Sequence, residues 1–287
     1  MEKFNIDPNS NQQSFTASTS FRYAVFHKTI YRTLCLGIDY AVNRWYLHLS
    51  IPYVDNTRQR MTATSDRMEV SGLGDISFMA WYNLTAKSKP VEKETPVQEK
   101  DVTKPEEKKE QIQSDNPLVI LVGAGLKLAT GDDSVHDRLG VFPPELQPGS
   151  GTVDKLFGVT AVKKVLGATG FIGTVYQLTG GTNSIHYEKK DRAYWNAGLT
   201  YELSKKNRLN LSLALNGVDI WEEDRNNGIK VPNTKGDWIY FSPSISINPF
   251  EKKNISFGLG FDYAVKEPSS SIYGMKRCVT VSASLGF

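Results

Sequence analysis

The chain has 287 residues, with 34 Lys and Arg against 31 Asp and Glu, and this near balance gives no argument for a nucleic-acid partner. Hydrophobic residues make up 39%, and no apolar run approaches the roughly 18–20 residues that a membrane-spanning helix needs, which excludes a helical membrane protein. A β-barrel is not excluded, because only alternate residues of its strands meet lipid and mean hydropathy stays low.

Apolar and polar residues alternate in a series of segments along the chain. Alternation is the pattern of a strand with two different faces. The pattern is weakest in 154–165 and 168–179; in 154–165 either of the two faces could be the apolar one, and in 168–179 Ile172, Tyr176 and Leu178 are favoured. The predicted strands cover residues 14–26, 30–41, 44–53, 75–84, 118–129, 154–165, 168–179, 192–203, 208–217, 238–247, 255–265 and 277–287.

The apolar faces could form the core of a soluble sandwich or meet lipid. The connections decide between these, because mostly short ones alternate with mostly longer ones, as periplasmic turns and outer loops do in a barrel. The connections 27–29 and 85–116 are exceptions to this order. The even strand number also suits a bacterial barrel. We therefore predict an all-β fold, a single 12-stranded antiparallel transmembrane up-and-down β-barrel.

The predicted domain organisation is an N-terminal tail (1–12) and a barrel (13–287). Segment 85–116, between the fourth and fifth predicted strands, has no aromatic residue and many Lys and Glu residues, and is predicted to be disordered. It could tether a periplasmic partner or be a solvated insertion. The predicted location is the bacterial outer membrane; since 1–10 lack a signal-peptide pattern, this assumes a signal outside the sequence given.

Several motifs resemble, in order, those of a family of outer-membrane transporters named for the meta-pathway of phenol degradation. They are YAVNRWYLHLSIPYV (40–54), GLGDISFMAWYNL (72–84), GAGLKLATGDD (123–133), GSGTVD (149–154) and FSPSISI (241–247). The resemblance implies an outer-membrane barrel that admits small, often aromatic compounds. Two departures are Ala129, at a position where the family has Pro, and the long charged insertion 85–116.

If the apolar faces meet lipid, the opposite faces line the interior. Mixed charges and aromatic rings there suit a solute that is partly apolar and partly polar, and bore width and lining charges would set selectivity. The charges could equally pair only with one another. The predicted pore-lining residues are Arg22, Tyr46, His48, Asp75, Met79, Trp81, Lys127, Tyr194, Asn196, Asn210, Trp238, Tyr240, Asp262 and Lys276.

Catalytic signals are weak. His48 and Ser50 are spaced as in the His-x-Ser of outer-membrane phospholipases, but they face the interior, and Ile51-Pro52 follows instead of Asn-Gly. No cofactor motif or metal-ligand spacing is present, and the two cysteines, Cys35 and Cys278, are predicted to be free thiols on the polar faces of their strands.

The prediction is a non-enzymatic channel for passive uptake of small solutes, aromatic or partly apolar ones included. Two alternatives stay open: a barrel hydrolase acting on lipid, and a non-transporting barrel that anchors a partner through 85–116. The expected partners are outer-membrane lipid or lipopolysaccharide and the solute, with no nucleic acid, no cofactor and no metal.

Overall fold

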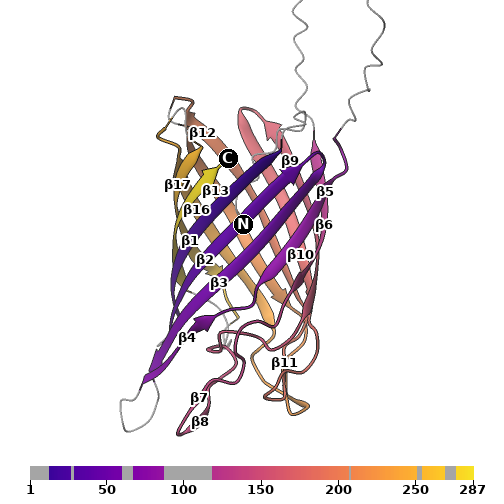
Figure 1. Ribbon diagram of the computed structural model, residues 1–287, viewed down its shortest axis with the longest axis vertical. Coiled ribbons are helices and arrows are strands. Elements are labelled where there is room, and N and C mark those ends of the chain that lie inside the picture. The colour runs from indigo at the N-terminus through magenta and orange to yellow at the C-terminus, as the bar shows by residue number, and fades with distance from the viewer. Residues whose placement is uncertain are drawn as a thin grey trace, which may run out of the picture.

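The computed structural model describes residues 13–26, 29–59, 67–86, 118–206, 208–250, 254–268 and 276–287. Their main feature is a closed antiparallel barrel of twelve tilted strands (Figure 1). No helix in these ranges is long and apolar enough to span a membrane. The barrel strands are β1 (Ser14–Phe26), β2 (Thr29–Val42), β3 (Trp45–Gln59), β5 (Ser77–Asn83), β6 (Val119–Lys127), β9 (Asp154–Val165), β10 (Ala168–Leu178), β12 (Arg192–Ser204), β13 (Leu209–Ile220), β16 (Gly236–Ile247), β17 (Ile255–Lys266) and β18 (Arg277–Gly286).

The first and last strands close the barrel. β1 pairs with β18 from Thr16 opposite Gly286 to Val25 opposite Arg277, and with β2 on its other edge. Closure leaves no open edge along this seam, which a membrane-spanning sheet requires. It also places one strand between the two cysteines, which are free thiols as predicted.

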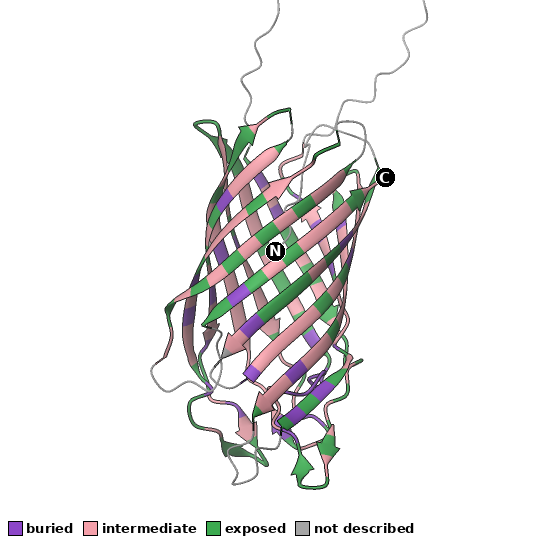
Figure 2. Cartoon of the chain, turned by 90° about the vertical axis from the view of Figure 1, so that its left-hand side faces the viewer, coloured by how far each residue is buried: buried purple, intermediate pink, exposed green. Residues whose placement is uncertain are grey.

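The outward faces of the strands are apolar. Leu34, Leu213, Leu259 and Val281 are all exposed, and exposed residues alternate with less exposed ones along the strands (Figure 2). The alternating residues therefore point into the barrel. The prediction of apolar outward faces is therefore confirmed. In β9, the ambiguous segment, Phe157 and Val159 point outward and are exposed.

One predicted loop is in fact a strand pair. The sequence predicts a polar loop of some twenty residues between the strands 44–53 and 75–84, but β3 continues to Gln59 and pairs with β4 (Arg67–Leu73). The outward face of this extension is polar because it faces water. Arg32 and Asp55 form an ion pair on that face. The inward face of β4 is apolar, since Met68 and Val70 are buried against Phe142 and Leu146 of the connection between β6 and β9.

The longer connections lie at the same end of the barrel as β4 and carry small hairpins of their own (Figure 1). These include β7 (His136–Asp137) with β8 (Gly140–Val141), and β11 (Tyr187–Glu188) with β14 (Arg225–Asn226) and β15 (Ile229–Lys230). Asn227 and Gly228 both have positive φ, 50° and 77°, as a tight two-residue hairpin turn requires. The long-loop end corresponds to the predicted outer side.

Two predicted segments, the N-terminal tail and the charged insertion, are almost entirely beyond the part of the chain that the structure describes. The tail 1–12 and nearly all of 85–116 lie outside the described residues, and the insertion follows β5, the fourth strand of the barrel itself. Thr85 is described, and its hydroxyl accepts a hydrogen bond from the Ile120 amide, so the two ends of the insertion are held together at the barrel.

Candidate functional site: the barrel interior

Charged side chains inside the barrel stay accessible to solvent. Arg22 and Asp262, on strands separated only by β18, form an ion pair at 3.3 Å, yet their side chains are 47% and 22% exposed. His48 Nδ1 lies 2.7 Å from Asp39 Oδ1 on the neighbouring strand, and these side chains are 29% and 23% exposed. Solvent therefore reaches these inward-facing groups within the barrel.

A second group of charges is tightly packed. Lys127 Nζ lies 2.8 Å from Asp75 Oδ2 and 2.9 Å from Asp154 Oδ2, and the two carboxylates are only 9% and 1% exposed. Asp75 also accepts hydrogen bonds from the backbone amide and the hydroxyl of Ser150. Paired and hydrogen-bonded in this way, buried charges are tolerable.

This charged group joins three of the sequence motifs. Asp75 comes from 72–84, Lys127 from 123–133, and Ser150 from 149–154. The connection between β6 and β9 is thereby held against the interior wall at the outer end.

A continuous row of cross-strand neighbours crosses the interior wall without a charged residue. Directly paired residues on one face of a sheet have neighbouring side chains, so the pairing register defines the row. It begins near the short-turn end of β2 and reaches the outer end of β16, because the strands are tilted (Figure 1). In pairing order, this apolar row consists of Ala41, Tyr46, Trp81, Gly123, Gly158, Val175, Tyr194, Val218 and Trp238.

Rows of different character lie on either side of the apolar row. On the outer side, the next inward row mixes the polar groups Asp39, His48, Gln177 and Arg192 with the apolar residues Met79, Leu156 and Ile220. On the other side, it carries the amides Asn196 and Asn216, which are direct cross-strand neighbours. Beside Tyr194, a solute against the wall would therefore meet an apolar strip with Arg192 on one side and Asn196 on the other.

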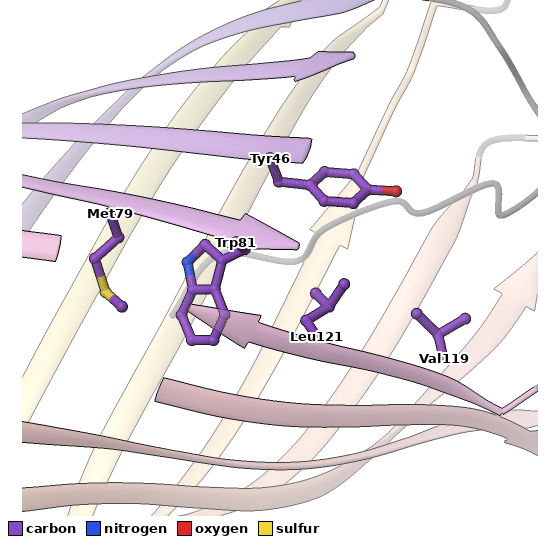
Figure 3. Close-up of a cluster of buried hydrophobic side chains, with 5 residues drawn as sticks. All are labelled: Tyr46, Met79, Trp81, Val119 and Leu121. Carbon is purple, nitrogen blue, oxygen red and sulfur yellow. The ribbon is translucent and has the colours of Figure 1, made fainter. Parts of the chain in front are cut away.

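The bulkiest part of the wall is formed by β3, β5 and β6. Tyr46, Met79, Trp81, Val119 and Leu121 form a buried cluster there (Figure 3). A second cluster, of Ile220, Trp238 and Tyr240, lies further out on β13 and β16. The two clusters occupy opposite ends of the apolar row.

The structure places the predicted site residues as follows. Arg22 pairs with Asp262, and Asp75 pairs with Lys127. The predicted aromatic residues Tyr46, Trp81, Tyr194 and Trp238 all belong to the apolar row, Tyr240 lies beside it, and His48, Met79 and Asn196 lie in the flanking rows. Asn210 donates a hydrogen bond to the carbonyl of Arg208 beside a short turn, and Lys276 is exposed just before β18.

Other inward residues were missed from sequence. Asp39, Asp154, Gln177 and Arg192 face the interior beside predicted site residues. Alternation could have found Asp39 and Arg192, since both lie on the polar faces of predicted strands. Gly123 and Gly158 carry no side chain, so the alternation of apolar and polar residues did not mark them as part of the site.

The arrangement does not form a hydrolase triad among the described residues. His48 is held by Asp39, while Ser50 Oγ lies 3.0 Å from Cys35 Sγ, and no hydrogen bond joins His48 to Ser50. A serine nucleophile needs a base within hydrogen-bond reach.

Hydrogen bonds join the long connections to one another at the outer end of the barrel. Asp224, fully buried, accepts hydrogen bonds from the Tyr187 hydroxyl at 2.9 Å and the Lys190 amide at 2.8 Å. Asp133 Oδ2 accepts a hydrogen bond from the Ser184 amide at 2.9 Å. Three separate outer connections are therefore joined by hydrogen bonds.

Fold and interior together define a transmembrane β-barrel of the outer-membrane kind. No protein-family model matches the chain, and no curated protein matches it in sequence, so the family predicted from the motifs stays a prediction. Among solved structures, the COG4313 outer membrane channel from Pseudomonas putida F1 is similar, with a TM-score of 0.66, 12% identity, and coverage of 99% of this chain and 100% of that chain.

Two further structures are more distant. The NanC porin has a TM-score of 0.48 at 9% identity and covers 94% of this chain and 98% of its own. The translocator domain of the autotransporter NalP from Neisseria meningitidis has a TM-score of 0.47 at 13% identity, with coverage of 98% and 90%. The likeness to the Pseudomonas channel establishes a shared barrel fold.

Proposed function

We propose that the protein is an outer-membrane channel for passive uptake of small solutes that are partly apolar. The observation that carries this proposal is the solvent-accessible interior beside Arg22, Asp262, Asp39 and His48, whose side chains remain accessible although the wall encloses them. The outward apolar faces meet lipid, and the interior offers a path past charged groups.

The apolar row supports the solute class. In the middle of this row Val175, Tyr194 and Val218 are half-buried. Gln177 and Arg192 lie on one side of them, and the amides Asn196 and Asn216 lie on the other. A ring or short hydrocarbon can lie on this row while its polar substituent bonds to the flanking groups. A fully hydrated ion gains nothing from such a wall, whereas an aromatic alcohol or amide does.

The test is solute uptake by proteoliposomes, with single-channel recording in planar bilayers beside it. We expect discrete conductance steps, and faster swelling with a small aromatic amide than with a sugar of similar mass. Absence of both conductance and swelling from a correctly folded barrel would overturn the channel. Equal rates for the two solutes would leave a channel without the proposed preference.

The outer mouth contains a pH-sensitive charge. Lys189 lies between β11 and β12, and burial lowers the pKa of its ammonium to about 8; Arg192 and Lys127 act in the same direction, against Asp224 and Asp75. Lys189 is therefore charged well below pH 8 and neutral well above it.

We expect anion preference, measured as the reversal potential in a salt gradient, to fall as pH rises from 7 to 9. Lys189→Met should show the weaker anion preference at both pH values. A pH dependence of the same size in this variant would assign the titration to another group.

A further inference from the structure

Trp81 lies flat against the barrel wall over two glycines. Its cross-strand neighbour on β6 is Gly123, whose own neighbour on β9 is Gly158. A Cβ atom added at Gly123 would lie 2.6 Å from Trp81 Cδ2, and one added at Gly158 would lie 2.4 Å from Trp81 Cη2. The indole thus spans the width of two neighbouring strands, and only residues without a side chain leave room for it there.

The position of the ring is tightly determined. Trp81 is only 5% exposed and packs in a cluster with Tyr46, Met79 and Leu121. The wall lies on one side of the ring, and neighbouring side chains such as Met79 and Val175 separate it from the bore on the other. Displacement away from the wall can move the ring only toward the interior.

From this geometry we propose that Gly123 and Gly158 form a shelf that keeps the Trp81 ring out of the bore, so that these three residues set the aperture at this level. The inference rests on the proposed channel function. It differs from a role in strand packing, because the nearest atoms to an added Cβ at Gly158 belong to the indole, whereas at Gly125 the nearest is the backbone oxygen of Phe78.

The chain offers a matched control. Gly260 also lies on an inward face, and a Cβ added there would meet Ser244 Cβ at 3.5 Å, which is ordinary contact. Gly260→Ala therefore adds the same methyl group to the interior without moving a ring.

The experiment compares single-channel conductance of wild type, Gly158→Ala, Gly260→Ala, Trp81→Ala and the double variant Trp81→Ala/Gly158→Ala. Because a narrower bore raises the barrier to conduction, we expect Gly158→Ala to lower conductance about twofold and Gly260→Ala to leave it unchanged. In the Trp81→Ala background, Gly158→Ala should have no effect. An equal loss with and without Trp81 would overturn the shelf.

A second readout does not require conduction. In protein labelled with 5-fluorotryptophan, the fluorine resonance that disappears in Trp81→Phe belongs to Trp81. We expect that resonance to shift in Gly158→Ala and to stay in place in Gly260→Ala. An unmoved resonance in folded Gly158→Ala would overturn the shelf whether or not the barrel conducts. If the wild type does not conduct but Gly158→Ala shows the shift, only the channel proposal is overturned.

Discussion

Replacing Lys127 with Met is expected to lower the free energy of unfolding by about 3 kcal/mol, in the range for breaking a buried ion pair. The lysine is the cation shared by Asp75 and Asp154, whose side chains are 9% and 1% exposed. Its loss leaves two buried carboxylates close together without a cation between them. The measurement is reversible urea unfolding in detergent or lipid, followed by tryptophan fluorescence.

An exposed ion pair supplies the control. Arg32 and Asp55 lie 2.9 Å apart on the outer surface of the strand extension, with side chains 37% and 44% exposed. Arg32→Met should cost less than about 1 kcal/mol, since water screens the pair. A cost for Lys127→Met no larger than that for Arg32→Met would show that the interior charges are solvated like surface ones.

The second large effect concerns the outward face. Val281 lies in the middle of β18 and is exposed on the apolar side. Val281→Lys is expected to destabilise the barrel in a lipid bilayer by about 2–4 kcal/mol, the cost of a cation on the lipid face near the bilayer midplane. Unfolding in liposomes of defined thickness measures this cost.

The adjacent residue is the matched control. Ser282 faces the interior, where it pairs with Ser20 of β1. Ser282→Lys should change stability far less, because the ammonium can reach water in the interior. Equal costs at the two positions would contradict the assignment of lipid and interior faces, on which the channel proposal depends.

Local alternation was enough to predict the twelve barrel strands and their faces, and the order of short and long connections then predicted the barrel class. Val279 and Val281 alternate with Cys278 and Thr280, and the structure places these sets on opposite faces. Side-chain direction in a strand follows from backbone geometry alone, so a single segment reveals it. The same rule placed Trp81 inside without knowledge of its neighbours.

Polar composition concealed the strand pair β3–β4. Outside the membrane, a strand can be stabilised by pairing while both residues of an ion pair such as Arg32–Asp55 face water. On the inward face the apolar alternation is short, Met68 and Val70 alone, and it packs against Phe142 and Leu146, which are distant in sequence. The segment by itself therefore resembles a loop.

The sequence by itself determined which residues point inward, because that depends on each residue's place in its own strand. Only the tertiary structure decided which inward residues meet: Asp75 with Lys127, and Trp81 over Gly123 and Gly158. These contacts depend on the register between strands, and register is set by how the whole sheet tilts and closes.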